Sequence, residues 1–205
     1  MIRHWIFKEN KEFLKHCYVL MGLILALVLI CLFFIDQRFA DYFGNPSRVH
    51  IWLFHREITE VGAAEPYILL TLAALLVPKF RKMAGFLLAC LLTCGIVVHL
   101  FKFTLGRARP HKFPDHNAFH FDFFNFHHHF QSLPSGHSQT LFTVATFLSF
   151  LFPKWTWAFL SLAFYFGMTR AFTLAHFVSD VLAGGLVGIL VTMLTLRFML
   201  KKYGP

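Results

Sequence analysis

Residues 83–104 read MAGFLLACLLTCGIVVHLFKFT and are soon followed by GRARP at 106–110. The stretch is almost continuously apolar over the roughly 20 residues that an α-helix needs to cross a bilayer. Lys102 and Arg109 then fall where such a helix would leave the membrane. Charges at this depth are costly and usually functional. The stretch therefore predicts a membrane helix with a polar site at one end.

Five further apolar stretches accompany this one. They occupy residues 17–35, 59–78, 137–153, 155–174 and 176–198. Pro78 and Pro153 fall where helices are expected to stop. Glu65 and Pro66 lie near the start of the second stretch, where a carboxylate and a proline suit the first helical turn. We expect one membrane domain over residues 1–205, an all-α integral membrane bundle of six transmembrane helices.

Composition supports a membrane protein and argues against other classes. Of the 205 residues, 57% are hydrophobic and only 14% are charged, which is too apolar for an ordinary soluble domain. The net charge of +9 favours a lipid bilayer as partner and no nucleic acid, because the cations do not gather in a polar segment. The cysteines are expected to be buried thiols rather than disulfides or metal ligands, at Cys17, Cys31, Cys90 and Cys94.

The cations also predict an orientation. Six crossings put both termini on one side of the membrane, and that side collects eleven of the 19 Lys and Arg residues. They are Arg3, Lys8, Lys11, Lys15, Lys79, Arg81, Lys82, Lys154, Arg197, Lys201 and Lys202. The positive-inside rule therefore predicts cytoplasmic termini, with the GRARP end of the third helix at the outer face.

Two long connections are expected on the outer side, at residues 36–58 and 105–134. Both are rich in aromatic residues, which favour the headgroup region, so we expect loops that border a lipid entrance. In the last apolar stretch, Gly184, Gly185 and Gly188 predict close packing against a neighbouring helix.

The segment RAFTLAHFVSD, residues 170–180, supplies Arg170, His176 and Asp180. On a helix, His176 and Asp180 lie on one face because they are four residues apart. An aspartate bonded to one imidazole nitrogen fixes the tautomer and leaves the other nitrogen free to attack an electrophile. A purely structural His–Asp pair is the alternative.

Two more segments can complete such a site. PSGH, residues 134–137, leads into an apolar stretch. There Ser135 can cap a helix whose free N–H groups bind an anion, Gly136 permits close approach, and His137 can donate a proton. Lys102 and Arg109, seven residues apart, can bind phosphate oxygens; the alternative for either is a cation that extends to the membrane surface. We interpret Arg107 and Lys112 as cations that extend to the membrane surface.

In their order and spacing the three segments resemble the motif of the type 2 phosphatidic acid phosphatase (PAP2) family, KxxxxxxRP, PSGH and SRxxxxxHxxxD. Lys102 and Arg109-Pro110 match the first part, Pro134 to His137 the second, and Arg170, His176 and Asp180 the third. Thr169 stands where the family motif has serine. The resemblance covers about residues 59–198, the expected PAP2-like core with a PAP2/haloperoxidase-like fold.

The resemblance implies a phosphatase that needs no metal and no cofactor. His176 would be the nucleophile and form a phosphohistidine, Asp180 would orient it, and His137 would protonate the leaving oxygen and then activate water. The phosphate would be bound by Lys102, Arg109, Ser135, Gly136 and Arg170.

Several other histidines lie near these motifs. Those at 111, 116, 120 and 127–129 can be interpreted as a loose metal patch or, as we prefer, as a solvated and partly protonated loop. His127, His128 and His129 are consecutive, so their side chains diverge and cannot share one metal ion. His99 lies one helical turn before Lys102 and is expected near the site.

These observations predict a bacterial inner-membrane lipid phosphatase with its active site at the periplasmic face. Candidate substrates are phosphatidic acid, phosphatidylglycerol phosphate, undecaprenyl pyrophosphate and phosphorylated lipid A, which the sequence does not separate. The alternative is a phosphotransferase that passes the phosphoryl group to a second lipid. A transporter or channel that binds an anion with the same charges is the third hypothesis.

Overall fold

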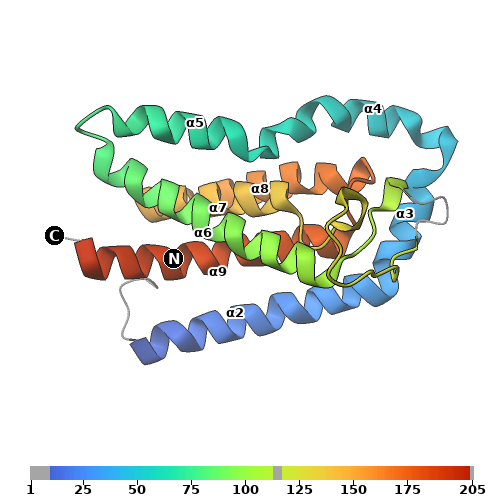
Figure 1. Cartoon of the computed structure of the whole chain (residues 1–205), viewed down its shortest axis with the longest axis horizontal. Helices are drawn as coiled ribbons and strands as arrows, with labels where there is room; N and C mark the ends of the chain where they lie inside the picture. Colours follow the sequence, from blue (N-terminus) through green and yellow to red (C-terminus); the bar gives the residue numbers. More distant parts are fainter. Residues whose placement is uncertain (1–9, 113–116, 204–205) are drawn as a thin grey trace.

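The computed structural model describes residues 10–112 and 117–203, and the regular elements within them are helices (Figure 1). One isolated antiparallel bridge joins Arg107 and Phe121. The predicted all-α fold is confirmed. Among the described residues, four helices are long and apolar enough to cross a membrane: Cys17–Gly44, Leu53–Leu75, Arg81–Leu105 and Val178–Tyr203.

In the second half of the chain the helices follow the predicted stretches closely. They are α6 (Arg81–Leu105), α7 (Gly136–Leu151), α8 (Thr156–Phe172) and α9 (Val178–Tyr203). α7 and α8 have only 16 and 17 residues. Both nevertheless pack against α9 and against each other, so the arrangement fits the predicted bundle of six membrane helices.

The first half of the chain is more helical than predicted. α2 (Asn10–Ile30) continues through a π-helical turn (Cys31–Ile35) into α3 (Asp36–Gly44). A 3₁₀ turn (Pro46–Arg48), α4 (Val49–Ile58) and a second 3₁₀ turn (Thr59–Gly62) then lead to α5 (Ala64–Leu75). The prediction of a loop over residues 36–58 was therefore wrong. Its aromatic side chains pack together instead, as when Phe39 and Phe43 both contact Phe172.

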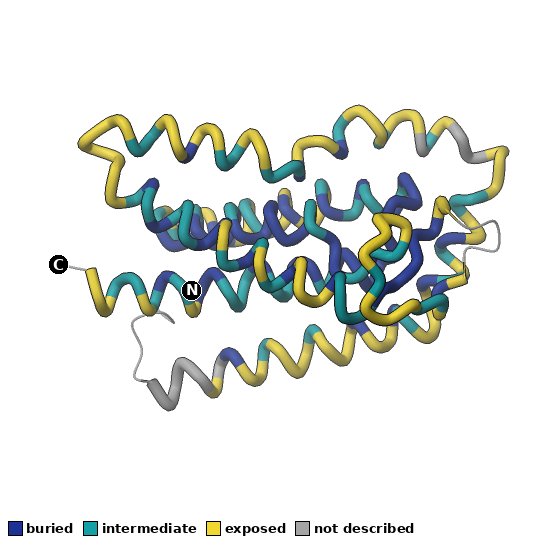
Figure 2. Tube along the Cα trace, viewed as in Figure 1, coloured by how far each residue is buried: buried dark blue, intermediate teal, exposed yellow. Residues whose placement is uncertain are grey.

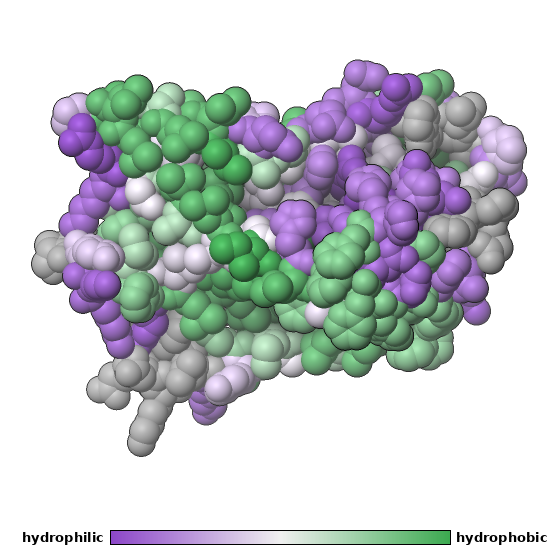
Figure 3. Space-filling view, viewed as in Figure 1, coloured by the Kyte–Doolittle hydropathy of each residue, from purple (hydrophilic) through white to green (hydrophobic). Residues whose placement is uncertain are grey.

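The bundle is centred on α7, which packs against α8 and α9, while α6 and α2 also lie against α9. The buried residues concentrate on these central helices, whereas α2 and α5 are largely exposed (Figure 2). On α5 and just beyond it, Leu69, Leu70 and Leu76 are 67%, 71% and 81% exposed. Figure 3 shows apolar surface lying between two hydrophilic ends. Such a surface requires lipid as its solvent, so the chain is a multi-pass membrane protein.

Glycines let α9 lie directly on α7, as predicted. A Cβ at Gly188 would be 2.7 Å from the carbonyl oxygen of Gln139, and one at Gly185 would be 3.0 Å from the Phe142 ring. A Cβ at Gly184 would collide with the carbonyl oxygen of Ser135. The contact at Gly184 holds the beginning of α9 against the beginning of α7, which is where two of the sequence motifs lie.

α6 ends at Gly106, which has a left-handed conformation with φ 55° and ψ 44°. A side chain there would overlap the backbone carbonyl of Asp122, and only glycine adopts this conformation without strain. Lys102 and Arg109 therefore do not share one continuous helix. The loop after Gly106 brings Arg109 back toward the bundle.

The three motifs lie at one end of the bundle. The loop after α6, the first turn of α7, the last turn of α8 and the first turn of α9 meet there, on the right in Figure 1. The beginning of α2 and the end of α9 lie at the opposite end. Because the helices alternate in direction, the short connections at 76–80 and 152–155 are also at that opposite end.

Candidate active site

Backbone hydrogen bonds connect the motifs to one another. The N–H of Ser135 donates to the carbonyl of Asp180 at 2.9 Å, and the N–H of His111 donates to the carbonyl of Leu174 at 3.0 Å. A Cβ on Gly136 would be 3.4 Å from Nζ of Lys102. The C-terminal turn of α6, the beginning of α7 and the α8–α9 loop therefore enclose one small volume.

His176 lies in the α8–α9 loop and is only 2% exposed. Its Nδ1 is 2.7 Å from the carbonyl oxygen of Ser132. Because a carbonyl only accepts hydrogen bonds, Nδ1 carries the proton and Nε2 keeps its lone pair. Burial, reinforced by the positive charges of Arg109 and Arg170, holds the pKa of His176 well below its usual value, although Asp180 acts in the opposite direction. The ring is therefore neutral and suited to nucleophilic attack.

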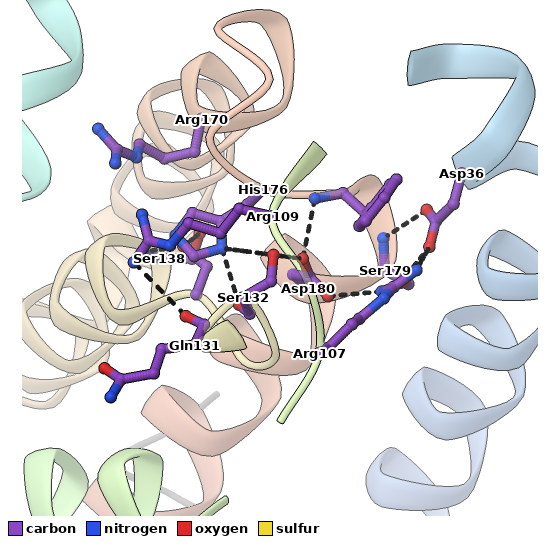
Figure 4. A network of polar contacts seen from close by, with 12 residues as sticks. Asp36, Arg107, Arg109, Gln131, Ser132, Ser138, Arg170, His176, Ser179 and Asp180 are labelled. Carbon is purple, nitrogen blue, oxygen red and sulfur yellow. Dashed lines mark hydrogen bonds and ion pairs between the residues drawn. The ribbon is translucent and has the colours of Figure 1, made fainter. Parts of the chain in front are cut away.

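The prediction of a direct hydrogen bond between His176 and Asp180 was wrong. Oδ2 of Asp180 is 3.8 Å from Nδ1 of His176. The two residues are linked instead through Ser132, whose hydroxyl donates to Oδ2 of Asp180 at 2.6 Å while its carbonyl contacts the imidazole (Figure 4). The backbone N–H of Phe177 also donates to Oδ2 at 2.9 Å. Ser132 was missed because a backbone carbonyl leaves no signal in the residue type and a single loop serine forms no pattern that would assign a role to its hydroxyl.

Three cations converge on this site. Lys102 and Arg109 are 8% and 7% exposed, and the Arg170 side chain is 12% exposed. Within the described residues, Nε of Arg109 and Nε of Arg170 are buried without a hydrogen-bond partner. Burial and the nearby Arg170 lower the pKa of Arg109 to about 10, so it stays charged at neutral pH. Buried cations with unused donors form a site for a multiply charged anion.

His137 is the second residue of α7, directly after the predicted cap. Oγ of Ser135 accepts from the N–H of Ser138 at 3.4 Å, which confirms the cap. Nε2 of His137 is buried and makes no hydrogen bond in the described parts of the chain, but lies 4.0 Å from Oε2 of Glu60. Glu60 is also 3.9 Å from Nη1 of Arg170. The sequence pattern did not indicate Glu60, which lies in the turn before α5.

A cavity of about 700 Å³ extends from this site between α5, α6 and α7. Its polar end is formed by Lys102, Gly136 and His137, and His99 contributes as predicted. Most of the remaining wall is apolar and includes Ile68, Leu91, Leu92, Ile96 and Phe103. The cavity is therefore shaped for a molecule with an anionic end and a hydrocarbon end.

Arg107 does not extend to the membrane surface, so this interpretation was wrong. It is fully buried and forms ion pairs with Asp36 and Asp180. Lys112 is exposed, as expected. Arg107 is buried because the packing of the α2–α3 helix brings Asp36 beside it. The carboxylate of Asp36 supplies the negative charge that a buried guanidinium needs as a partner.

The described part of the histidine-rich loop contains no compact metal centre. Among the residues described, no group of three or more His, Cys, Asp or Glu side chains is close enough to hold a metal ion; His116 lies outside them. Arg109 and burial lower the pKa of His128, and burial lowers that of His111. Both directions disfavour protonation of these two histidines, while His127, His128 and His129 are exposed, in keeping with the interpretation of a solvated loop. The four cysteines are free and buried, as predicted.

The buried imidazole, the second histidine and the converging cations form one polar, cationic site at the end of a membrane bundle. The model of the PAP2 superfamily matches residues 83–203, and the chain belongs to this family. The chain is also similar to two proteins named lipid A 1-phosphatase. The protein from Rhizobium johnstonii is 42% identical over 101 residues, 49% of this chain and 41% of the relative. The protein from Rhizobium etli is 39% identical over 111 residues, 54% of this chain and 48% of the relative.

These alignments cover less than half of the length of each relative. No solved structure shows significant similarity to the chain.

Proposed function

We propose that this protein is a lipid phosphatase in which His176 attacks the phosphorus atom and forms a phosphohistidine. The observation that carries the proposal is a buried imidazole that shares one end of the bundle with three buried cations, of which Lys102 also lines an apolar cavity. Membership of the PAP2 superfamily and the names of the two relatives support the same reaction class.

In the first step, Nε2 of His176 bonds to phosphorus as the bond from phosphorus to the lipid oxygen breaks. His137, which begins this step as the imidazolium, gives a proton to that oxygen, so that the lipid leaves as a neutral alcohol and His137 becomes neutral. Lys102, Arg109 and Arg170 bind the oxygens on which charge increases, together with the Ser135 side chain and the Gly136 N–H. The backbone carbonyl of Ser132 keeps the imidazole in the reactive tautomer, and Asp180 accepts a hydrogen bond from the hydroxyl of the same serine.

In the second step, water attacks phosphorus and gives a proton to His137. The nitrogen–phosphorus bond breaks, inorganic phosphate is released, and His176 regains its lone pair. These residues supply the nucleophile, the acid–base group and the charge stabilisation, so we propose that the reaction needs no metal ion or other cofactor.

We propose a glycolipid of the lipid A type as the substrate, with the 1-phosphate as the group removed. The relatives are named for this activity, and the cavity beside the phosphate site has apolar walls that accommodate an acyl chain. Phosphatidic acid, phosphatidylglycerol phosphate and undecaprenyl pyrophosphate are the competing substrates. The positive charges near 79–82, 154 and 197–202 support a bacterial inner membrane with that end in the cytoplasm and the site at the periplasmic face.

The test is phosphate release by purified protein from a panel of these four lipids, without an added acceptor. Wild-type protein is expected to release phosphate in the presence of EDTA, fastest from the lipid A type substrate. His176→Ala is expected to lower kcat at least about 1000-fold, roughly 4 kcal/mol in the barrier. The control is His50→Ala, which changes an exposed histidine on α4.

A His176→Ala protein that turns over near the wild-type rate contradicts the nucleophile. Phosphate transfer that appears only when a second lipid is added supports the phosphotransferase instead. Activity that EDTA abolishes and a divalent metal restores contradicts the metal-independent mechanism.

A further inference from the structure

We propose that Asp36, on the first membrane helix, is a positioning residue for this reaction and acts through Arg107 on Asp180. The inference rests on the proposed function. Asp36 is 1% exposed and lies outside the stretch that the family model matches, residues 83–203. It contacts neither His176 nor the cavity, so any effect on the reaction must pass through the residues that it binds.

Arg107 joins the two carboxylates directly (Figure 4). Its Nη2 donates to Oδ2 of Asp36 at 2.8 Å, and its Nη1 donates to Oδ1 of Asp180 at 2.6 Å. All three side chains are fully buried. Two buried carboxylates share one guanidinium, so when both are ionised the group has a net negative charge that faces the imidazole through Asp180.

Ser179 closes the network on the α9 side. Its backbone N–H donates to Oδ1 of Asp36 at 3.0 Å, and its hydroxyl makes a short hydrogen bond to Oδ2. The same hydroxyl accepts from Nη1 of Arg107 at 2.7 Å. Asp36 therefore binds both the guanidinium and the first turn of α9, the turn that carries Asp180.

The other donors of Arg107 are also occupied. Nε and Nη2 donate to the carbonyl of Ala118 at 3.0 and 2.8 Å, and the guanidinium lies 4.1 Å from the Phe177 ring centre. The position of Arg107 is therefore fixed from several sides. With Oδ1 of Asp180 held by Arg107, its Oδ2 faces Ser132 and hence His176.

A π-helical turn directs Asp36 into this network. The N–H of Asp36 donates to the carbonyl of Cys31 and ends the turn at Cys31–Ile35. An extra residue in a turn rotates the rest of the helix by roughly 100° relative to a regular α-helix. Phe33 and Phe34, just before Asp36, are 60% and 66% exposed, which is normal for a lipid-facing helix. Such π turns are frequent at functional sites.

Asp36→Asn keeps the shape of the side chain but removes its charge. Arg107 then pairs with Asp180 alone, so the carboxylate that supports the imidazole is neutralised more completely. We expect kcat to fall roughly 10-fold, because residues within one polar network commonly interact with energies of about 1 kcal/mol. KM for the lipid should change little. Asp36→Glu, which keeps the charge, is expected to retain more activity than Asp36→Asn.

The decisive measurement is a double-mutant cycle with Asp180→Asn. If Asp36 acts on Asp180, Asp36→Asn reduces the residual kcat of the Asp180→Asn protein by less than about twofold. A structural role predicts the same fold-loss in both backgrounds. Asp41→Asn, an exposed carboxylate on α3, is the matched control and should turn over like wild type.

Equal losses in the two backgrounds, or an Asp36→Asn protein with wild-type kcat, overturn the positioning role. If Asp36→Asn does not fold, the Asp36→Glu variant replaces it in the same cycle with the same two criteria. Wild-type protein that releases phosphate from no lipid overturns the proposed function instead, so the two failures are distinguishable.

Discussion

The tautomer of His176 depends on a backbone carbonyl rather than on a carboxylate. The carbonyl of Ser132 contacts Nδ1 at 2.7 Å, whereas Asp180 is 3.8 Å away. A backbone carbonyl is not protonated at neutral pH, so it orients the imidazole without removing its proton. Asp180 then influences the ring mainly through the field of a buried anion.

The environment of His176 predicts the acid limb of the pH profile. Burial and the charges of Arg109 and Arg170 lower the pKa of His176 from the usual 6.5, and they outweigh Asp180, which raises it. A lowered pKa means that the neutral nucleophile persists as the pH falls through 6.5. We expect kcat/KM to decline only well below that pH. The measurement is the pH dependence of kcat/KM. The profile is corrected for ionisation of the substrate phosphate, which phosphorus NMR determines. A corrected midpoint at or above 6.5 contradicts a lowered pKa for His176.

At the scale of helices, the contact between α7 and α9 aligns the PSGH segment with Asp180. The N–H of Ser135 donates to the carbonyl of Asp180. This hydrogen bond requires a close approach of the two helices, which the glycines of α9 permit because they lack a Cβ. Packing in lipid depends on such close approach, because apolar burial gives little driving force between membrane helices.

Gly188→Ala is expected to destabilise the bundle by about 1–3 kcal/mol, because the added methyl group is forced against backbone. Its Cβ would lie 2.7 Å from the carbonyl oxygen of Gln139. The measurement is thermal unfolding in detergent. Gly22→Ala on α2 is the matched control, since a Cβ there has no neighbour within 4 Å. Equal transition temperatures for the Gly188→Ala and wild-type proteins contradict the packing argument.

The sequence predicted the helices of the second half well because lipid imposes both their length and their composition. It also located His176, His137, Asp180 and the cations. It did not predict the roles of Asp36, Ser132 or Arg107. Asp36 and Arg107 meet only when the first helix packs beside the loop after α6, and Ser132 acts through a backbone carbonyl and a hydroxyl whose partners are 44 and 48 residues away in the chain. Local patterns contain neither kind of information.

For the whole molecule, the proposed function assigns binding of the lipid chain to the apolar cavity and the reaction to residues at its polar end. The walls lie on α5, α6 and α7, whereas the proposed nucleophile, His176, lies in the α8–α9 loop. A change deep in the cavity should therefore affect long-chain substrates without disturbing the phosphate site.

Gly95→Leu tests this separation. Gly95 lines the cavity, and a Cβ there has no neighbour within 4 Å, so the larger side chain fills space that a lipid chain would occupy. We expect kcat/KM to fall roughly tenfold for a long-chain lipid phosphate, about the effect of losing one or two buried methylene contacts. A short, water-soluble phosphate ester should react at the wild-type rate.

The matched control is Gly85→Leu, on the same helix and equally free of neighbours within 4 Å. It should leave both substrates unaffected. Equal losses for the long and short substrates in the Gly95→Leu protein show that the cavity does not bind the chain.

Gly106 imposes a restriction on how this sequence can vary over generations. Its φ is 55°, and a Cβ would collide with the carbonyl of Asp122. Every missense change in its codon adds a Cβ and therefore incurs both penalties at once. A lineage that retains the loop carrying Arg107 and Arg109 must keep glycine here, even while the surrounding apolar residues exchange freely for one another.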